Sequence, residues 1–305
     1  MSSSEDLSTV MANESLSTTT AIIQRAVDYL HTGPTRVVGL IMTNCVIATS
    51  FSGAVIEAVA IVFFINQFYR KNKYVASAYF YIAFAGYCVD FTAISLFVIT
   101  FWLPDFYMLK LISDVNQWYV GFYNGPWNVS LSLNRFTAIV LFQRHPRVWS
   151  NRNTLFIVIL LFLGPFIISG YSLADPYCRS HVYDSGCEAY LSKSRIIEIS
   201  TNLVSCCISA VLTLISIYFL KPTVTSTWTS SARNASFERR LFIQCAVSTA
   251  LFIFYNMFLL SYNFFRPHRT ESAMLGFVYV VSVNLTNLAY NIYHYLNIIL
   301  LIFVR

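Results

Sequence analysis

Long apolar stretches separated by short polar segments make up most of this chain. Each stretch is long enough to cross a bilayer as a helix, which takes about 20 apolar residues. The pattern predicts an all-α membrane protein, a seven-transmembrane helix bundle with its two termini on opposite sides of the membrane. The predicted spans cover about 43–69, 74–100, 118–141, 154–173, 196–220, 241–264 and 273–303.

The composition agrees with a lipid environment. Of the 305 residues, 56% are hydrophobic and only 11% are charged, whereas an ordinary soluble domain is about 25% charged. The formal net charge is +6, but the basic residues lie in short segments between the apolar stretches. This distribution argues against nucleic acid as a partner and indicates the bilayer instead.

The first 42 residues are predicted to be a Ser/Thr-rich, partly disordered tail, and residues 43–305 the membrane domain. Residues 1–20 lack the apolar core of a cleavable signal peptide, so the first span is expected to target the chain itself. The break at Gly33-Pro34 leaves two alternatives, because Val37–Met42 can also lengthen the first helix. Asn13 begins the sequence Asn-Glu-Ser, a glycosylation site if the tail is outside.

The charges of the loops predict an orientation. One set of loops, together with Arg305, carries 11 Lys and Arg residues, and the opposite set carries 6. The more basic loops of a membrane protein usually face the cytoplasm. We therefore expect the N-terminus outside and the C-terminus inside.

A polar motif, Leu-Asn-Arg-Phe, ends the third predicted span at residues 133–136. One reading is a positively charged anchor, because an arginine this close to water can extend its charged end to the surface. The other reading is a bundle-facing Arg135 that changes partner between two states, with Glu238 as the candidate partner. The basic segment 142–149 that follows suits either lipid headgroups, with Trp149 in an interfacial belt, or a cytoplasmic protein.

This segment resembles a known family. Asn134-Arg135-Phe136, followed by His145-Pro146 and Trp149, is similar to the third-span signature of nematode serpentine chemoreceptors, in particular Srv-like members of the Srg superfamily. The resemblance covers the seven-span layout, about residues 40–305. It implies a G-protein-coupled receptor of the plasma membrane, typically in sensory cilia, that detects small external chemicals.

By this resemblance, Arg135 would face the α subunit of a heterotrimeric G protein. The chain departs from rhodopsin-like receptors, because Asn134 stands where an acid would precede the arginine. No Lys lies in the seventh span, which excludes a retinal Schiff base and therefore an opsin. The residues expected to serve G-protein coupling are Asn134, Arg135, Arg144, Arg147, Trp149, Glu238, Arg239 and Arg240.

The outer half of the third span is rich in aromatic residues and carries Gly125-Pro126, which is expected to kink the helix and open space beside it. A small-ligand pocket between helices needs such a kinked, aromatic and mildly polar lining. The alternative is an interfacial aromatic belt combined with packing. The candidate ligand-pocket residues are Asp90, Trp118, Tyr119, Tyr123 and Trp127.

Acidic and amide side chains inside the spans predict a polar network. A charge at the centre of a span costs about 2.5–3.5 kcal/mol, so Glu57 should face the bundle and have a partner. Asn284, Asn287 and Asn291 lie on one face of the seventh span and are the candidates. We favour helix–helix contact over a direct ligand site for this network.

Two cysteines, Cys178 and Cys187, share the second outer loop, where a disulfide would restrain a lid over the pocket, although connectivity cannot be read from sequence. The seven cysteines show no metal-ligand spacing, and no catalytic motif appears. We therefore expect no enzyme activity, no metal and no cofactor. The alternative to a receptor is a transporter or channel, in which Glu57, Asp90 and the asparagine face would line a path. The absence of an internal repeat weakens that alternative.

Overall fold

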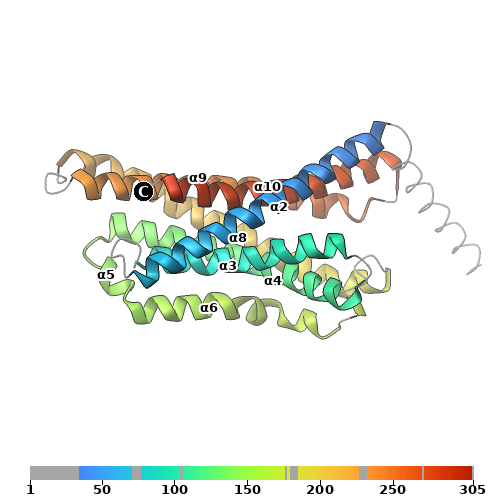
Figure 1. Ribbon diagram of the computed structural model, residues 1–305, viewed down its shortest axis with the longest axis horizontal. Helices are drawn as coiled ribbons and strands as arrows, with labels where there is room; N and C mark the ends of the chain where they lie inside the picture. Colours follow the sequence, from blue (N-terminus) through green and yellow to red (C-terminus); the bar gives the residue numbers. More distant parts are fainter. Residues whose placement is uncertain are drawn as a thin grey trace, which may run out of the picture. The chain divides into compact units, whose positions relative to one another are not determined.

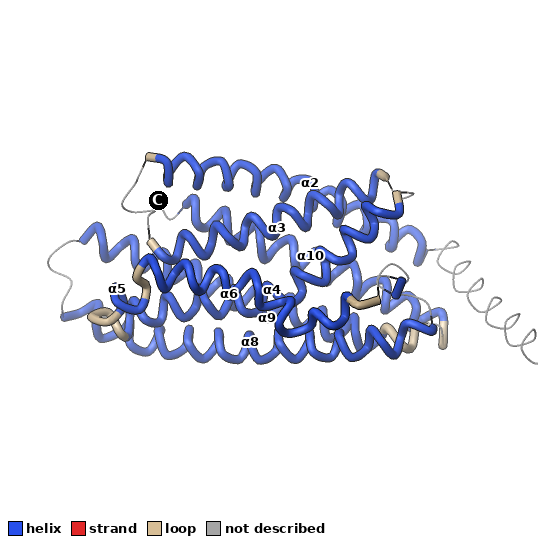
Figure 2. The backbone as a smooth tube through the Cα atoms, turned by 90° about the horizontal axis from the view of Figure 1, so that it is seen from below, coloured by secondary structure: helices blue, strands red, loops and turns tan. Residues whose placement is uncertain are grey.

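The structure, a computed structural model, describes residues 34–70, 77–103, 106–175, 177–178, 185–226, 232–269 and 271–303. Within these ranges all regular structure is helical (Figure 2), as predicted for an all-α protein. The predicted glycosylation site at Asn13 lies outside the described residues.

Each predicted span corresponds to one long helix (Figure 1). A short helix and a 3-10 turn complete the described elements. In chain order they are α2 (Pro34–Tyr69), α3 (Ala78–Trp102), α4 (Tyr107–Val140), α5 (His145–Val148), α6 (Asn151–Ser169), η1 (Gly170–Leu173), α8 (Ser185–Ser226), α9 (Ala232–Phe265) and α10 (Ala273–Phe303).

Six of these helices are long and apolar enough to cross a membrane, and α4 is the exception among the seven long ones. Its 34 residues give sufficient length, but charged residues such as Lys110 and Asp114 and several Asn and Ser residues lower its hydropathy. α4 packs against α3, α6 and α8. Its Asn124, Asn128 and Ser132 are buried, and neighbouring helices rather than lipid surround such side chains, so this part of the helix tolerates a more polar sequence.

Several helices begin earlier than predicted. α2 begins at Pro34, where the missing N–H and the fixed φ of proline suit the first helical position. Val37–Met42 therefore belongs to the first helix, and the predicted domain boundary at residue 42 falls inside it. α4 begins at Tyr107 instead of about 118, and α8 at Ser185 instead of about 196. Hydropathy marks the apolar part of a helix, whereas the hydrogen-bonded backbone continues into its polar ends.

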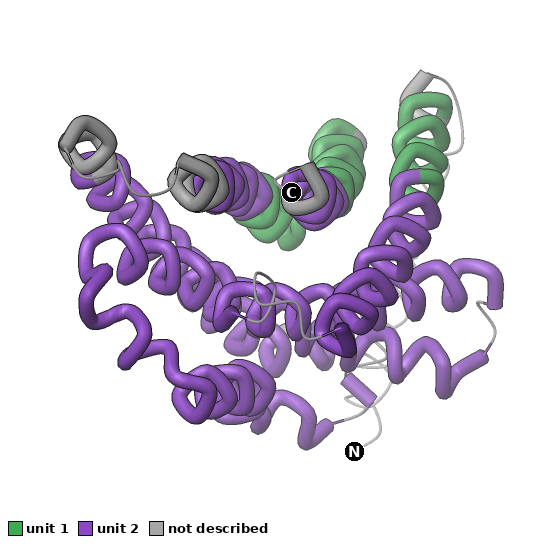
Figure 3. Tube along the Cα trace, turned by 60° about the vertical axis from the view of Figure 1, so that its left-hand side comes forward, with its two compact units in different colours: residues 1–48, 257–288 green, residues 49–256, 289–305 purple. Residues whose placement is uncertain are grey.

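The chain forms two compact units (Figure 3). One contains residues 1–48 and 257–288, and the other contains residues 49–256 and 289–305. In the described part of the first unit, Tyr262 and Tyr279 pack with ring centroids 5.6 Å apart, and the Thr43 hydroxyl lies 3.5 Å from Asn284 Oδ1. All of the side-chain clusters described below, except where stated, lie within the second unit.

Two glycines allow α8 to lie very close to α4. A Cβ at Gly121 would lie 2.5 Å from Glu198 Oε1, and a Cβ at Gly125 would lie 2.7 Å from Ser205 Oγ. The amide of Asn202 donates to the Gly121 carbonyl over 2.9 Å. Small residues four positions apart are a common basis for close helix contact in membranes. The face of α4 that carries Gly121 and Gly125 is therefore covered by α8, and the opening at the Gly125-Pro126 kink stays a prediction.

Candidate functional site

The end of α4 carries a buried arginine. Only 5% of Arg135 is exposed, and its guanidinium lies 4.2 Å from the centroid of the Tyr79 ring on α3. Its terminal nitrogen donates to Asn134 Oδ1 over 2.9 Å. We call Tyr79, Asn134 and Arg135 the arginine site. The reading of Arg135 as a surface anchor is wrong, because the side chain turns into the bundle instead of reaching for water.

A second contact fastens the following helix, α5, to α4. The indole Nε1 of Trp149 donates to the Thr137 hydroxyl over 2.7 Å, and His145 Nδ1 lies 3.1 Å from the same oxygen. We call Thr137, His145 and Trp149 the threonine interlock. Trp149 is 7% exposed, so the alternative that it belongs to an interfacial tryptophan belt is wrong.

The basic residues around these two clusters differ in exposure. Arg144, Arg147 and Arg240 are exposed, which keeps them accessible to a partner. The side chains of Glu238 and Arg239 lie outside the described residues. Pairing between Arg135 and Glu238 stays a prediction.

Replacement of Thr137 by valine should loosen the interlock. Valine has nearly the same shape but no acceptor for the Trp149 N–H. A buried donor left without a partner costs about 1–3 kcal/mol. We expect faster hydrogen exchange of the α5 amides in the purified protein. Thr100→Val is the control, because the Thr100 hydroxyl only donates to the Leu96 carbonyl of its own helix. Equal exchange in the two variants would contradict the role of Thr137.

The interlock should also weaken at acidic pH. Burial, and secondarily the charge of Arg135, lower the pKa of His145 below its ordinary value of 6.5. As pH falls below about 6.5, the undocked imidazole gains its proton before the docked one, so docking loses free energy. We expect α5 amide protection, corrected for intrinsic exchange rates, to fall between pH 7.5 and 5.5. His145→Gln should remove this pH dependence, and a variant with an unchanged pH dependence would contradict it.

Three ionisable side chains meet in the bundle interior. Glu57 on α2, Asp90 on α3 and His294 on α10 are each 0% exposed. One ligand atom from each lies within 4.8 Å of the others. Asp90 Oδ2 contacts His294 Nδ1, and the Tyr290 hydroxyl donates to Asp90 Oδ1 over 3.0 Å. We call Glu57, Asp90 and His294 the carboxylate–histidine triad.

Aromatic rings hold the histidine of the triad. The Trp127 ring stacks on the imidazole with centroids 5.9 Å apart and an interplanar angle of 11°. Tyr290 and Tyr293 lie 4.3 and 4.5 Å from it. The Trp127 indole in turn donates to the Ile82 carbonyl over 2.9 Å. His294 is therefore fixed between α4 and its own helix.

The asparagines of the seventh span do not serve as predicted. Asn291 donates to the hydroxyls of Thr49 and Ser50, at 2.9 and 3.0 Å, and both oxygens of Glu57 lack a hydrogen-bond partner among the described residues. The predicted pairing of Glu57 with this asparagine face is wrong. Asn284 belongs to the first unit and lies against Thr43 there, and Asn287 is half-buried.

Sequence reasoning missed the partner that Glu57 does approach. His294 was the one His within the predicted seventh span. A histidine flanked by tyrosines in an apolar span was the available signal. That signal does not say which residues of α2 and α3 lie beside His294, because this depends on how the helices pack.

The candidate pocket residues do not form one surface. The Trp118 and Tyr119 rings pack on Phe166 of α6, and the Tyr119 hydroxyl donates to the Phe162 carbonyl over 3.0 Å. Tyr123 also lies against α6, with its ring centroid 5.9 Å from that of Phe162. Trp127 and Asp90 instead meet at His294. The predicted set therefore divides into an α6-facing group and a triad-facing group.

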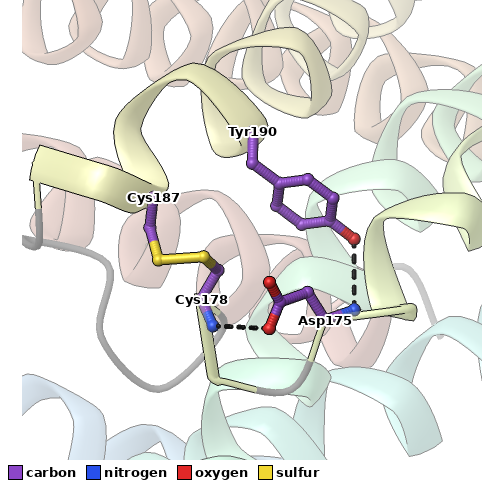
Figure 4. Close-up of a disulfide and its surroundings, with 4 residues drawn as sticks. All are labelled: Asp175, Cys178, Cys187 and Tyr190. Atoms are coloured by element: carbon purple, nitrogen blue, oxygen red, sulfur yellow. Dashed lines mark hydrogen bonds between the residues drawn. A yellow bond between two sulfur atoms is a disulfide. The ribbon is translucent and has the colours of Figure 1, made fainter.

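A disulfide joins Cys178 and Cys187, with their Cα atoms 5.1 Å apart (Figure 4). Asp175 Oδ1 accepts from the Cys178 N–H over 3.2 Å. The Tyr190 hydroxyl accepts from the Asp175 N–H and donates to the Tyr171 carbonyl, at 3.2 and 3.1 Å. The start of α8 is thus tied to the chain that follows η1.

Peptide mapping without reductant should recover this disulfide from the purified protein. We expect a linked peptide pair that contains Cys178 and Cys187, and we expect reduction to separate it. The loop lies on the predicted outer side, where an oxidising environment preserves disulfides. Cys206 and Cys245 are the internal control, because both are buried free thiols. Free thiols at both loop positions would contradict the predicted lid.

Comparison with known proteins identifies the family. The family described as serpentine type 7TM GPCR chemoreceptor Srv matches residues 105–305, which is about two thirds of the 305-residue chain. No curated protein matches the chain. The matched range contains Arg135, the threonine interlock, the disulfide and His294. The chain is a multi-pass membrane protein that belongs to the Srv family of serpentine seven-transmembrane chemoreceptors.

Proposed function

We propose that this chemoreceptor binds a small external chemical in the outer half of its bundle and activates a heterotrimeric G protein at the predicted cytoplasmic end. The observation that carries the proposal is the arginine site. Arg135 is a permanent charge that is buried against a neutral ring and a neutral amide. This position, at the end of α4 that is predicted to be cytoplasmic, suits a guanidinium that exchanges partners during activation.

The proposed activation is an exchange of contacts by Arg135. Asn134 offers the guanidinium one neutral amide oxygen, whereas a carboxylate would add an opposite charge and can accept two parallel hydrogen bonds. The Asn134 that stands where an acid would be therefore lowers the cost of releasing the guanidinium. The exposed Arg144 and Arg147 lie next to His145 and Trp149 of the threonine interlock in the sequence. A ligand that favours the released arrangement would present these basic groups together to the α subunit.

Unsatisfied polar atoms on α4, together with one on α8, support a ligand beside α4 in the bundle interior. The Tyr123 hydroxyl, both amide atoms of Asn124 and Asn202 Oδ1 are buried without hydrogen-bond partners among the described residues. Asn202 lies against Gly125, the neighbour of Asn124. A buried polar group without a partner costs about 1–3 kcal/mol. A small molecule that offers both a donor and an acceptor would relieve this cost, and the surrounding aromatic rings would hold its apolar part.

A chemical screen in cells with a promiscuous G-protein reporter tests this function. We expect some small molecules to raise reporter output only in cells that display the receptor. Tyr123→Phe should lower their potency about threefold to tenfold, the worth of one neutral hydrogen bond. Tyr218→Phe is the matched control, because Tyr218 is 73% exposed on α8.

The transporter alternative predicts chemical transport across the membrane instead of G-protein reporter output. Chemical-dependent flux in proteoliposomes, without any G protein and without reporter output in cells, would overturn the receptor proposal. We also propose, from what the family resemblance implies, a location in the plasma membrane of sensory cilia, which immunolocalisation of the tagged chain tests.

A further inference from the structure

We propose that the carboxylate–histidine triad is a binding site for one divalent transition-metal ion, for which Zn²⁺ is the best-suited probe. The three side chains come from α2, α3 and α10 and offer two carboxylates and one imidazole. An ion held among them would join these three helices within the second unit.

The first support is that the triad contains donor atoms with nothing to bind. Both Glu57 oxygens are buried and lack a hydrogen-bond partner among the described residues. Glu57 is 0% exposed, and its ligand oxygen lies within 4.8 Å of those of Asp90 and His294. A buried carboxylate is normally paired, hydrogen-bonded or bound to a metal. The two Glu57 oxygens lie close to Asp90 and His294, but neither of these residues donates a hydrogen bond to them.

Charge favours a divalent ion over a monovalent one. Two carboxylates in the interior of a bundle carry a charge of −2 when ionised, and each is costly to place in a membrane. A divalent ion neutralises both while the imidazole stays neutral. A monovalent ion would leave one negative charge uncompensated.

The donor types favour a transition metal over Mg²⁺ or Ca²⁺. Hard cations of that kind select oxygen ligands, whereas imidazole suits Zn²⁺, Cu²⁺ and Ni²⁺. Zinc is often held by three protein ligands of His and carboxylate type, with a fourth position for water. The triad supplies this number and mixture of ligands.

The spacing requires only a small adjustment. Ligands about 2.0–2.2 Å from a tetrahedral zinc ion lie about 3.3–3.6 Å from one another, compared with the limit of 4.8 Å in the triad. An ion would replace the direct contact between Asp90 Oδ2 and His294 Nδ1. Tyr290 orients Asp90 through its other oxygen, and Trp127 orients the imidazole. Such outer contacts hold ligands in place for a metal.

Metal content of the full-length receptor tests the proposal. The purified protein in lipid nanodiscs is stripped with chelator, dialysed against micromolar ZnCl₂ and measured by elemental mass spectrometry. We expect about one Zn²⁺ per chain, and at least a tenfold lower affinity in Glu57→Gln. Excess Na⁺, Mg²⁺ or Ca²⁺ should not displace the ion.

Two control variants separate the triad from other zinc sites. Glu198→Gln removes a carboxylate from α8 outside the triad. His268→Ala removes the exposed imidazole that lies 2.6 Å from Glu271. Both should retain the ion. All variants keep their free cysteines. Zinc bound by thiols would therefore remain in Glu57→Gln and would be measured there.

X-ray absorption of zinc in the wild-type protein keeps the test decisive if Glu57→Gln does not fold. Only nitrogen and oxygen neighbours at about 2.0–2.2 Å are expected, and sulfur at about 2.3 Å would overturn the proposal. Wild-type protein that takes up no zinc would also overturn the proposal. So would unchanged zinc affinity in a folded Glu57→Gln protein.

Discussion

Replacement of Arg135 by alanine is expected to abolish ligand-dependent G-protein output at equal surface expression. The guanidinium is the charge that we propose to pass from the arginine site to the α subunit. A desolvated cation–ring contact is worth about 2 kcal/mol or more, a factor of about 30 in an equilibrium between receptor arrangements. Alanine removes both this contact and the group offered to the partner. Dose–response curves in reporter cells measure the loss.

Two arginine variants sharpen the test. Arg152→Ala removes an exposed arginine at the start of α6 and should leave output within about twofold, as surface charges are worth little. Arg135→Lys keeps the positive charge but loses the planar group that stacks on Tyr79, so an intermediate output is expected. Normal output from Arg135→Ala would show that coupling does not pass through this residue.

Replacement of Gly86 by alanine is expected to destabilise the folded bundle, and more than the same replacement of Gly164 on α6. A Cβ at Gly86 would lie 2.2 Å from the Trp127 indole, which is far closer than van der Waals contact. The indole cannot withdraw freely, because it is 1% exposed and bonded to the Ile82 carbonyl. Overpacking of this kind costs about 1–3 kcal/mol.

The thermal midpoint of the purified protein should therefore fall by about 3–8 °C in Gly86→Ala. Displacement of Trp127 would also remove the ring that stacks on His294, so zinc binding should weaken together with stability. Gly164→Ala on α6 is the matched control, because nothing lies within 4 Å of its added Cβ. Alanine should leave the midpoint unchanged or raise it there. A Gly86→Ala midpoint equal to that of Gly164→Ala would show that α3 and α4 separate without cost.

The spans were predictable because a helix in contact with lipid needs a long run of apolar residues, which the sequence shows directly. Every predicted span is a helix in the structure, and even α4 was found, although its sequence is too polar for a lipid-facing helix. The helix ends were less predictable. The first turns of α4 and α8 are polar, and a hydrogen-bonded backbone outside the apolar layer has no hydropathy signal.

The motif at the end of α4 was also predictable, since Asn134, Arg135 and Trp149 lie within one segment of 16 residues. Their contacts were not. Tyr79, which packs on Arg135, belongs to α3, and Thr137, which accepts from Trp149, looked like an ordinary helix residue. The aromatic pocket set failed for the same reason. Its members share a segment of α4 but face different neighbours.

The sequence by itself determined the class of protein, because the solvent of each segment follows from the apolarity of that segment, and a local motif such as Asn-Arg-Phe needs no distant partner. Only the tertiary structure decided which polar groups meet inside the bundle. Glu57, Asp90 and His294 lie on three helices far apart in the chain. Their meeting depends on the rotation and depth at which each helix packs, and glycines such as Gly86, Gly121 and Gly125 set that depth by what their missing side chains allow.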